Sequence, residues 1–336
     1  MKLFNSKVLA ASAEGSGLGF GCMGISAFYG AAMEDAKAIE LLKGVYDGGC
    51  RHFDTAEVYR MEGSKPNETI IGEFLQTVPR DSYSIATKYW PGHDNPNVYE
   101  YDDVKAHLKS SLERLQLEYV DLYYAHRVFS VEGGIKFAKA CQKLKEEGLI
   151  KEAGLSEVSG KWLKQIHQEG GTIDAVQQEW SLMTRSLEEE MVPVCKELGI
   201  AIVAYSPLSR NMLAKKTEVL ADKTDFRANL PRYSKENIDN NNQIVEKVQE
   251  LGKKHNASAA QVSLAWLFHK AEELGVAVIP IPGTTKIKNA TDNFGSVKVK
   301  LTDEDCTELE TLAGKVAGER YQESFMGNNM SIESQK

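Results

Sequence analysis

The sequence is short of the features that mark several large classes of protein. Its 336 residues include only five cysteines, which are widely scattered and form no CxxC pair. This pattern argues against a disulfide framework and a zinc site, and it favours a reducing cytosol. No apolar run approaches the roughly 18–20 residues that a membrane span needs. Basic residues number 40 against 48 acidic ones, so the formal charge of −8 disfavours nucleic acid as a partner.

The length and the two ends of the chain bound its domain organisation. The first residues end like a cleavage site, but a polar Asn-Ser-Lys triplet interrupts the short apolar stretch. We therefore expect no signal peptide and a cytoplasmic protein. Length alone favours two domains, although closed α/β barrels of about 250 residues form one. We predict one domain at 18–320, an N-terminal segment at 1–17 that caps it, and a flexible C-terminal tail at 321–336.

Short apolar or β-branched runs alternate with helical patterns along the chain. Most runs recur every 20–40 residues or so, a spacing of about one βα unit, which fits an α/β fold rather than a sandwich. Between residues 208 and 275 a polar segment and two helical patterns interrupt this order. We therefore expect a long loop with helices between the seventh and eighth strands. The predicted strands are residues 18–24, 52–56, 83–89, 120–126, 151–157, 174–180, 201–207 and 276–282.

Two α/β architectures accommodate this order of elements. Eight strands with intervening helices favour a single-domain (β/α)8 barrel, the TIM barrel. An open doubly wound sheet is the competitor, because residues 19–24 spell G-x-G-x-x-G, the pattern of a dinucleotide-binding turn. That turn should open a helix at once, whereas residues 25–32 have the composition of a loop and the helical pattern starts near Met33. We therefore interpret the glycines as the end of the first barrel strand.

Polar side chains lie where a barrel would use them. In such barrels the functional groups gather at the carboxyl ends of the strands. Asp54 and Tyr59 lie at and after the end of the second predicted strand, Lys88 at the end of the third and His126 at the end of the fourth. Each alone has an ordinary structural explanation, such as a turn residue, a surface phenol, a solvated lysine or a half-buried histidine. One site that used all four would protonate a carbonyl oxygen without a metal.

The chemistry of these four side chains is complementary. A tyrosine is a poor acid–base catalyst at its ordinary pKa of about 10. The ammonium of Lys88 beside it would favour the phenolate, and Asp54 would hold that lysine charged and in place. His126 would donate to a carbonyl oxygen and orient it. We therefore predict Asp54, Tyr59, Lys88 and His126 as one catalytic group.

Six motifs accompany the ends of the predicted strands: FDTAEVY at 53–59, TK at 87–88, HRV at 126–128, GLSE at 154–157, AYSPL at 204–208 and IPGTTK at 281–286. This ordered set resembles the aldo-keto reductase superfamily from about residue 17 to about residue 320. The GLSEVS, AYSPLSR and DFRANLPRY segments are most similar to a branch with pyridoxal reductases, perakine-reductase-like plant enzymes and auxin-induced-type reductases. This resemblance implies a (β/α)8 barrel that reduces an aldehyde or ketone with NADPH.

The resemblance implies the role of each catalytic residue. Tyr59 donates the proton in carbonyl reduction and is the base when the same site oxidises an alcohol. Lys88 and Asp54 tune its pKa, and His126 orients the carbonyl. Aromatic side chains that follow barrel strands are candidates for an apolar substrate pocket. They are Phe28, Tyr29, Tyr89, Trp90 and Phe129.

The resemblance also implies a site for NADPH and NADP+. Ser156 and Gln177 match positions that hold the nicotinamide carboxamide, and Tyr205 matches the ring that stacks on the nicotinamide. A phosphate site built from the loops after strands seven and eight is also what the barrel fold leads us to expect. The other predicted cofactor contacts are Met23, Ser206, Leu208, Arg210, Gly283, Thr284, Lys286, Lys288, Asp292 and Asn293.

Several positions depart from the commoner pattern of the family, among them Glu157 and Asn289. Many relatives have G-x-S-N where this chain has Ser156-Glu157, although Glu is frequent in the branch named above. Asn289 stands where many NADPH-preferring relatives have arginine. The expected preference for NADPH over NADH therefore depends mainly on Lys286 and Lys288.

Two other classes of function remain open at this point. A redox-sensing regulatory subunit, like the potassium-channel β-subunits that share this fold, would bind NADPH tightly, turn over slowly and need an assembly partner. A Schiff-base enzyme with Lys88 as nucleophile would leave Tyr59 and the nucleotide-like loops unexplained. The predicted partner is a small-molecule carbonyl substrate, with pyridoxal and aromatic or aliphatic aldehydes as candidates. The sequence predicts no metal, nucleic acid or membrane, and it leaves the oligomeric state open.

Overall fold

The computed structural model describes residues 6–92, 95, 98–220, 222, 225–322 and 335. Within these residues, eight parallel strands form one sheet in which each strand neighbours the next in chain order. All eight lie within or overlap the predicted ranges. They are β1 (Phe20–Gly21), β2 (His52–Asp54), β3 (Ser84–Tyr89), β4 (Val120–Ala125), β5 (Ile150–Ser156), β6 (Ala175–Glu179), β7 (Ala201–Tyr205) and β8 (Val278–Pro280).

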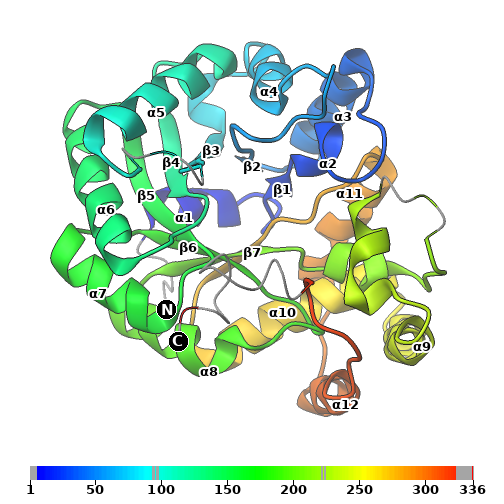
Figure 1. Cartoon of the computed structure of the whole chain (residues 1–336). Coiled ribbons are helices and arrows are strands. Elements are labelled where there is room, and N and C mark those ends of the chain that lie inside the picture. Colours follow the sequence, from blue (N-terminus) through cyan, green and yellow to red (C-terminus); the bar gives the residue numbers. More distant parts are fainter. Residues whose placement is uncertain are drawn as a thin grey trace.

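The sheet curls into a barrel surrounded by helices (Figure 1). Its parallel register runs from Phe20 opposite Phe53 on β1 and β2 to Ile202 opposite Val278 on β7 and β8. The first strand is joined to the last, because the amide just before β1 donates to the carbonyl of Pro280 at 3.0 Å. The prediction of a single-domain (β/α)8 barrel is therefore confirmed, and the open doubly wound sheet is excluded.

The glycines at 19–24 are required by close packing in the barrel. A Cβ on Gly21 would lie 2.7 Å from the carbonyl oxygen of Ile281. A Cβ on Gly19 would lie 2.8 Å from the side chain of His52. Neither position has space for a side chain, so glycine lets the first strand approach its neighbours.

Helices form an outer ring around the strands. The helix α2 corrects the sequence analysis, which predicts a loop from residue 25. The amide of Ala27 donates to the carbonyl of Met23 at 3.0 Å and closes one short turn. The helices are α1 (Lys7–Ala13), α2 (Met23–Ser26), α3 (Asp35–Asp47), α4 (Asn67–Leu75), α5 (Tyr101–Leu115), α6 (Val131–Glu146), α7 (Gly160–Gly170), α8 (Leu187–Leu198), α9 (Ile238–Lys254), α10 (Ala259–Leu274), α11 (Ile287–Phe294) and α12 (Asp303–Ala313).

Helix α5 illustrates how the sequence produces these elements. Asp102 and Asp103 lie in its first turn, where negative charge suits the positive end of the helix dipole. Val104, Leu108 and Leu112 recur every four residues, so they share one face and are buried. The main core of the protein lies between such helix faces and the sheet, and a second, smaller apolar cluster fills part of the barrel interior.

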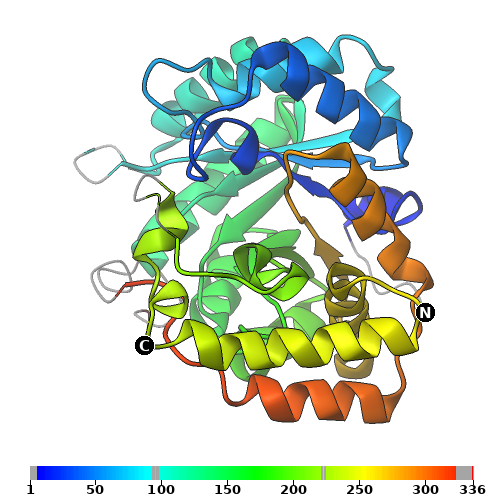
Figure 2. The same cartoon turned by 90° about the vertical axis from the view of Figure 1, so that its right-hand side faces the viewer.

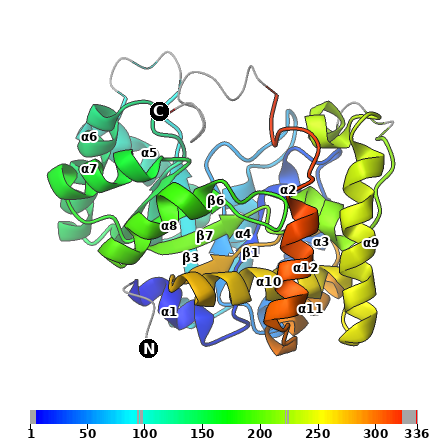
Figure 3. The same ribbon diagram turned by 90° about the horizontal axis from the view of Figure 1, so that it is seen from below.

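Helix α1 lies at the amino-terminal end of the barrel (Figure 3). Leu9 is fully buried and packs with Leu122 in the cluster inside the barrel. The carboxylate of Glu152 accepts hydrogen bonds from the hydroxyl of Ser6 at 2.5 Å and from the amide of Lys7 at 2.8 Å. Helix α1 therefore covers the amino-terminal end of the barrel, and the open end is the one where the carboxyl ends of the strands lie.

The segment between β7 and β8 carries the insertion that the sequence predicts. Short 3-10 turns at Ser209–Ala214, Phe226–Asn229 and Pro231–Tyr233 precede α9 and α10. Helix α12 packs beside α9 (Figure 2). Within the described part of the chain, no helix combines the length and the apolar character that crossing a membrane requires.

Most of the predicted flexible tail, residues 323–334 and 336, lies outside the described residues. Tyr321 and Gln335, which are described, are both buried. The side-chain amide of Gln335 donates to the backbone carbonyl of Glu157 at 2.8 Å. Two points of the C-terminal segment are therefore packed against the open end of the barrel.

Candidate active site

A cavity of about 940 Å³ opens at the carboxyl ends of the strands. Its volume suits a small-molecule ligand, because such pockets usually measure about 300–1,000 Å³. Loops from strands throughout the barrel contribute to it, so residues far apart in the sequence meet there. Of the predicted site residues, those that line it are Met23, Phe28, Tyr29, Asp54, Tyr59, Trp90, His126, Ser156, Gln177, Tyr205, Ser206, Leu208, Arg210, Gly283, Thr284, Lys286, Asp292 and Asn293.

Next to this cavity, Asp54, Lys88 and Tyr59 form a hydrogen-bonded chain. Lys88 is fully buried, and its Nζ donates to Oδ1 of Asp54 at 2.5 Å. The same ammonium donates to the carbonyl of Thr55 at 2.6 Å and to the hydroxyl of Tyr59 at 3.4 Å. Three acceptors use all three donors of an ammonium group. The lysine is therefore fixed in one orientation, with the phenol of Tyr59 between it and the cavity.

Neighbouring amides hold this chain in place. Nε2 of Gln177 donates to Oδ2 of Asp54 at 2.7 Å, so both oxygens of that carboxylate are paired. The side chain of Asn67 accepts from the hydroxyl of Thr55 at 2.7 Å and donates to the carbonyl of Cys22 at 3.0 Å. The loop that carries Tyr59 is thus tied to the first strand and to α4, which fixes the position of the phenol.

Burial and charge act in opposite directions on this chain. Burial raises the pKa of Tyr59 above its ordinary value of 10.0, and the attraction of Lys88 offsets only part of that rise. Burial alone would lower the pKa of Lys88, but Asp54 and Tyr59 outweigh it and raise the pKa. At neutral pH the site therefore holds an ammonium and a neutral phenol. The sequence analysis anticipates the effect of Lys88 on Tyr59 but not the larger effect of burial.

These charge states bear on the Schiff-base alternative. A lysine attacks a carbonyl as the free amine, which burial away from opposite charge favours. Lys88 is instead held as an ammonium by a carboxylate 2.5 Å away and does not line the cavity. The geometry therefore disfavours Lys88 as a nucleophile.

His126 faces the same part of the cavity as Tyr59. The two rings meet edge to face with centroids 5.7 Å apart, and Trp90 meets His126 in the same manner at 5.6 Å. Burial lowers the pKa of His126 well below 6.5, and the charges of Arg127 and Lys88 lower it further. A neutral imidazole carries one N–H and donates one hydrogen bond from it. The cavity is thus lined by a phenol and a neutral imidazole that lie side by side.

The part of the cavity next to α11 differs in character from the part around Tyr59. Lys286 is exposed and directly precedes the first turn of α11, and its amide donates to the hydroxyl of Thr284 at 3.2 Å. The side-chain amide of Asn289 donates to the same hydroxyl at 3.2 Å. A Cβ on Gly283 would lie 2.4 Å from the Gly21 carbonyl oxygen, so this loop lies against the barrel. A long cavity with an acid–base pair at one end and cationic and amide donors at the other fits a nicotinamide dinucleotide.

Tyr89 and Phe129 do not line the cavity, which corrects their prediction as substrate contacts, and Lys288 lies outside the cavity lining as well. Tyr89 is fully buried and donates its hydroxyl to Asp103 on α5 at 2.5 Å, so it packs between the barrel and the helices. Phe129 packs partly buried against the main core. Lys288 is exposed in the first turn of α11.

Phe226 and Tyr321 line the cavity although the sequence analysis assigns them no role. Their ring centroids lie 6.4 Å apart, and Phe226 also contacts Phe28 at 6.0 Å. Neither residue follows a barrel strand, because one belongs to the insertion and the other to the C-terminal segment. The only sequence signal for Phe226 is its place in the family-like segment at 225–233.

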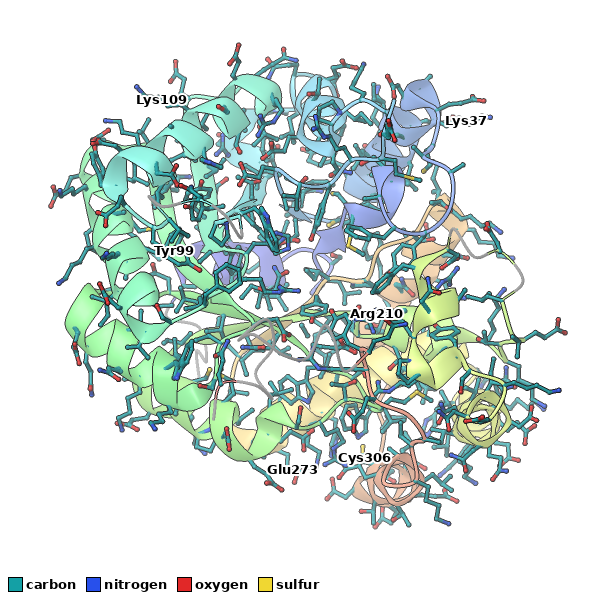
Figure 4. All side chains as sticks on the ribbon, in the orientation of Figure 1. Lys37, Tyr99, Lys109, Arg210, Glu273 and Cys306 are labelled. Carbon is teal, nitrogen blue, oxygen red and sulfur yellow. The ribbon has the colours of Figure 1, made fainter. Side chains whose placement is uncertain are left out.

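A buried ionic cluster of Glu157, Glu179, Arg210 and Arg320 adjoins the cavity beside Tyr205. Glu157 accepts from the Tyr205 hydroxyl at 2.7 Å and from Nη2 of Arg320 at 2.6 Å. Nη1 of Arg320 also reaches Glu179 at 3.4 Å, and Glu179 pairs with Arg210 at 3.1 Å. Arg210 lies towards the centre of the face in Figure 4 and lines the cavity. Its guanidinium is already paired with the carboxylate of Glu179.

The acid stability of the protein is expected to depend on Glu157. Burial would raise the pKa of Glu157, but the charge and hydrogen bonds of Arg320, with Arg127 and Tyr205, outweigh it and lower the pKa to about 2. An ordinary glutamate titrates near 4.5, so this carboxylate stabilises the fold above that pH and the stabilisation is lost as pH falls towards 2. The unfolding free energy of the wild type should fall as the pH falls from neutral towards 2, and we call this fall the acid limb. Glu157→Gln should make that fall smaller by about 3 kcal/mol. Urea unfolding at a series of pH values measures this change in the unfolding free energy.

Glu152, under helix α1, provides a control of opposite sign. Burial raises the pKa of this carboxyl group, and the hydrogen bond from Ser6 offsets the rise only in part. A raised pKa in the folded state favours folding as the pH falls, so Glu152→Gln should steepen the acid limb. Identical acid limbs in the wild type and in Glu157→Gln would contradict the assignment of Glu157.

The described residues contain neither a cluster of metal-ligating side chains nor a disulfide. No group of three or more His, Cys, Asp or Glu side chains there is placed to hold a metal ion. The five cysteines are free thiols, and all are buried.

Comparisons with known proteins agree with this geometry. A family model described as "Aldo/keto reductase family" matches residues 17–313. A curated relative, the "Probable aldo-keto reductase 1" of Glycine max, is 41% identical over 318 residues, which are 92% of this chain and 89% of that protein. The solved aldo-keto reductase Tm1743 is 26% identical with a TM-score of 0.70, and the match covers 88% of this chain and 94% of that one. The glycerol dehydrogenase AKR11B4 from Gluconobacter oxydans has the same fold, with a TM-score of 0.75 at 24% identity over 89% of this chain and 92% of that one.

Proposed function

Because this chain belongs to the aldo/keto reductase family, we propose that it reduces an aldehyde or ketone to the alcohol with NADPH, with Tyr59 as the proton donor. Family membership makes it an oxidoreductase that uses a nicotinamide cofactor. The observation that carries the finer proposal is the chain from Asp54 through Lys88 to Tyr59, which ends at the cavity. A neutral phenol beside a fixed ammonium is the arrangement that proton donation to a carbonyl requires.

The four catalytic residues have separate tasks in this proposal. NADPH, when bound, supplies the hydride. His126 donates a hydrogen bond to the carbonyl oxygen and orients it, while Tyr59 gives that oxygen its proton. The phenolate left on Tyr59 is stabilised by the ammonium of Lys88, and Asp54 keeps that ammonium charged. For alcohol oxidation the same phenolate acts as the base.

The cofactor is proposed to lie along the cavity from Tyr205 to α11. Ser156 and Gln177 would hold the nicotinamide carboxamide, and Tyr205 would stack on its ring. Lys286 is the exposed cation at the far end and would meet the phosphate on the adenosine ribose. The remaining proposed contacts are Met23, Ser206, Leu208, Arg210, Gly283, Thr284, Asp292 and Asn293.

The substrate end of the cavity is rich in aromatic rings. Phe28 is 44% exposed and meets the ring of Tyr59 edge to face with centroids 6.4 Å apart. Tyr29, Trp90 and Phe226 line the same cavity. We therefore propose aromatic or aliphatic aldehydes as substrates, with pyridoxal among the candidates.

A cofactor comparison tests the proposal. The wild type should oxidise NADPH in the presence of para-nitrobenzaldehyde and should prefer it to NADH. Lys286→Ala should weaken NADPH binding by about tenfold and NADH binding by less than about twofold, because only NADPH carries the additional phosphate. Fluorescence titration measures the two affinities, and loss of nicotinamide absorbance measures turnover.

Lys288→Ala is the matched control, since it removes the same charge two residues away and outside the cavity lining. A wild type that binds neither cofactor would refute the proposal. Tight NADPH binding without turnover of para-nitrobenzaldehyde, pyridoxal or other aldehydes would favour the regulatory-subunit alternative.

We also propose a cytoplasmic location, which the five free and buried thiols support. Cell fractionation with an antibody to the protein tests it, and recovery in a secreted or organellar fraction would refute it.

A further inference from the structure

Apart from Arg210, the ionic cluster beside Tyr205 has no part in the chemistry proposed above, yet it touches the ring proposed to meet the nicotinamide. We infer that Arg320, from the C-terminal segment, is a positioning residue that fixes the ring of Tyr205 and thereby sets the affinity for the nicotinamide cofactor. This inference rests on the proposed function, because Tyr205 meets the cofactor only there. It gives the end of the chain a role in the active site.

The first argument is that both ends of the Tyr205 side chain are fixed. Its backbone ends β7, and its ring lines the cavity. Its hydroxyl donates to Glu157 at 2.7 Å and accepts from Nη1 of Arg320 at 3.1 Å. The hydroxyl of Tyr321 also lies 3.1 Å away. A phenol held at its Cα and again at its oxygen keeps the long axis of its ring in one place, and a ring that stacks on it is positioned along that axis.

The second argument is that Arg320 holds the groups that hold Tyr205. Its guanidinium makes two bonds to Glu157, at 3.1 Å and 2.6 Å, and a third contact to Glu179 at 3.4 Å. Glu157, Glu179 and Arg320 are only 1%, 3% and 2% exposed. Buried carboxylates need a compensating charge, so the position of Glu157 depends on this guanidinium.

The third argument is the conformation of Glu157. Its φ is +54°, in the left-handed region that costs free energy for residues other than glycine. Ser156 just before it lines the cavity, whereas Glu157 does not and points into the ionic cluster. Contacts with Arg320 and Tyr205 offset the cost of that turn. The strained turn therefore serves the ring of Tyr205 rather than a direct contact with a ligand.

A matched control distinguishes the positioning of Tyr205 by Arg320 from a merely structural role of Arg320 in the C-terminal segment. Arg232 is also buried, and it donates to the carbonyl of Gly318 at 3.2 Å and to the hydroxyl of Thr184 at 2.7 Å. It therefore anchors the same C-terminal segment. Its contacts in the described structure reach Glu179 at 4.0 Å but neither Tyr205 nor Glu157.

The test measures the dissociation constant of NADPH by fluorescence for four single variants and one double variant of the full chain. Arg320→Met should weaken binding by about tenfold and Arg232→Met by less than about twofold. Arg320→Lys should fall between them, because a single ammonium cannot reproduce the forked contacts of a guanidinium. Tyr205→Phe, which deletes only the hydroxyl, should weaken binding about fivefold. Adding Arg320→Met to Tyr205→Phe should then cost less than about twofold more, since both act through one ring.

Steady-state kinetics add a second readout. KM for NADPH should rise in Arg320→Met while the pH profile of kcat keeps the shape of the wild type, because Tyr59 and Lys88 are untouched. Thermal melting of each variant checks its folding, and Tyr205→Phe and Arg320→Lys carry the test if Arg320→Met does not fold.

The outcomes separate this inference from the proposed function. Equal losses of affinity in Arg320→Met and Arg232→Met would overturn the inference, as would unchanged affinity in Tyr205→Phe. In both cases a wild type that binds and turns over NADPH would leave the proposed function standing. A wild type that binds neither NADPH nor NADH would overturn both.

Discussion

Tyr59→Phe is expected to lower the turnover of a carbonyl substrate by about a thousandfold while it leaves NADPH affinity within about twofold of the wild type. The substitution deletes only the hydroxyl that lies 3.4 Å from Nζ of Lys88. The ring remains, so its edge contacts with Phe28 and His126 remain as well. Loss of turnover without loss of NADPH binding would therefore show that the variant lacks only the proton that Tyr59 donates. Absorbance assays with para-nitrobenzaldehyde and fluorescence titration of NADPH measure the two quantities.

Tyr124→Phe provides the matched control for this result. Tyr124 is also a fully buried tyrosine of the barrel, on β4, but it does not line the cavity. Its substitution should leave turnover within about twofold. A Tyr59→Phe enzyme with the turnover of the wild type would exclude the phenol as proton donor.

The pH dependence of reduction should agree with the burial of Tyr59. Because burial raises the pKa of this phenol above 10.0, it remains protonated throughout the neutral range. The phenol of Tyr59 should therefore remain available as the proton donor for reduction up to at least pH 10.0. Oxidation of the alcohol, which needs the phenolate, should accelerate as the pH rises.

The barrel was predictable because each strand carries its own local signal. Parallel strands covered on both faces are usually short apolar or β-branched runs, and all eight predicted runs overlap strands. The same logic placed Asp54, Lys88 and His126, since the carboxyl end of each run can be read directly. The short helix α2 was missed because one helical turn is too short to show a periodicity.

Strand alternation explains one error among the predicted substrate contacts. Successive residues of a strand face opposite sides of the sheet. Lys88 points into the barrel and pairs with Asp54, so Tyr89, the next residue, must point to the helices, where it meets Asp103. The alternation of side chains along the strand is visible in the sequence, and it predicts the position of Tyr89 better than its closeness to the end of the strand does.

The ionic cluster had no such local signal. Glu157 and Arg320 are 163 residues apart, and nothing in the sequence around either residue names the other. Charged side chains are usually exposed, so a lone arginine near the C-terminus reads as surface. Only the closure of the barrel and the return of the chain after α12 bring the two charges together.

Lys88→Met is expected to reduce both stability and turnover. The substitution leaves the carboxylate of Asp54 buried, with Gln177 as its remaining hydrogen-bond donor among the contacts described above. Breaking a buried ion pair from one side usually costs about 3–5 kcal/mol. Turnover should fall by a further factor of about a hundred to a thousand, because the phenolate of Tyr59 loses its stabilising charge. Urea unfolding and absorbance assays at neutral pH measure the two effects.

A second variant separates these two losses. Asp54→Asn combined with Lys88→Met removes both charges, so much of the stability should return while turnover stays low. Arg80→Met is the control for stability alone, because Arg80 pairs with the buried Asp121 at 2.8 Å near the opposite ends of the strands. It should lower the unfolding free energy and leave kcat unchanged. If the double variant recovered turnover together with stability, Lys88 would be a structural residue, and the pairing of phenol with ammonium would no longer account for the chemistry.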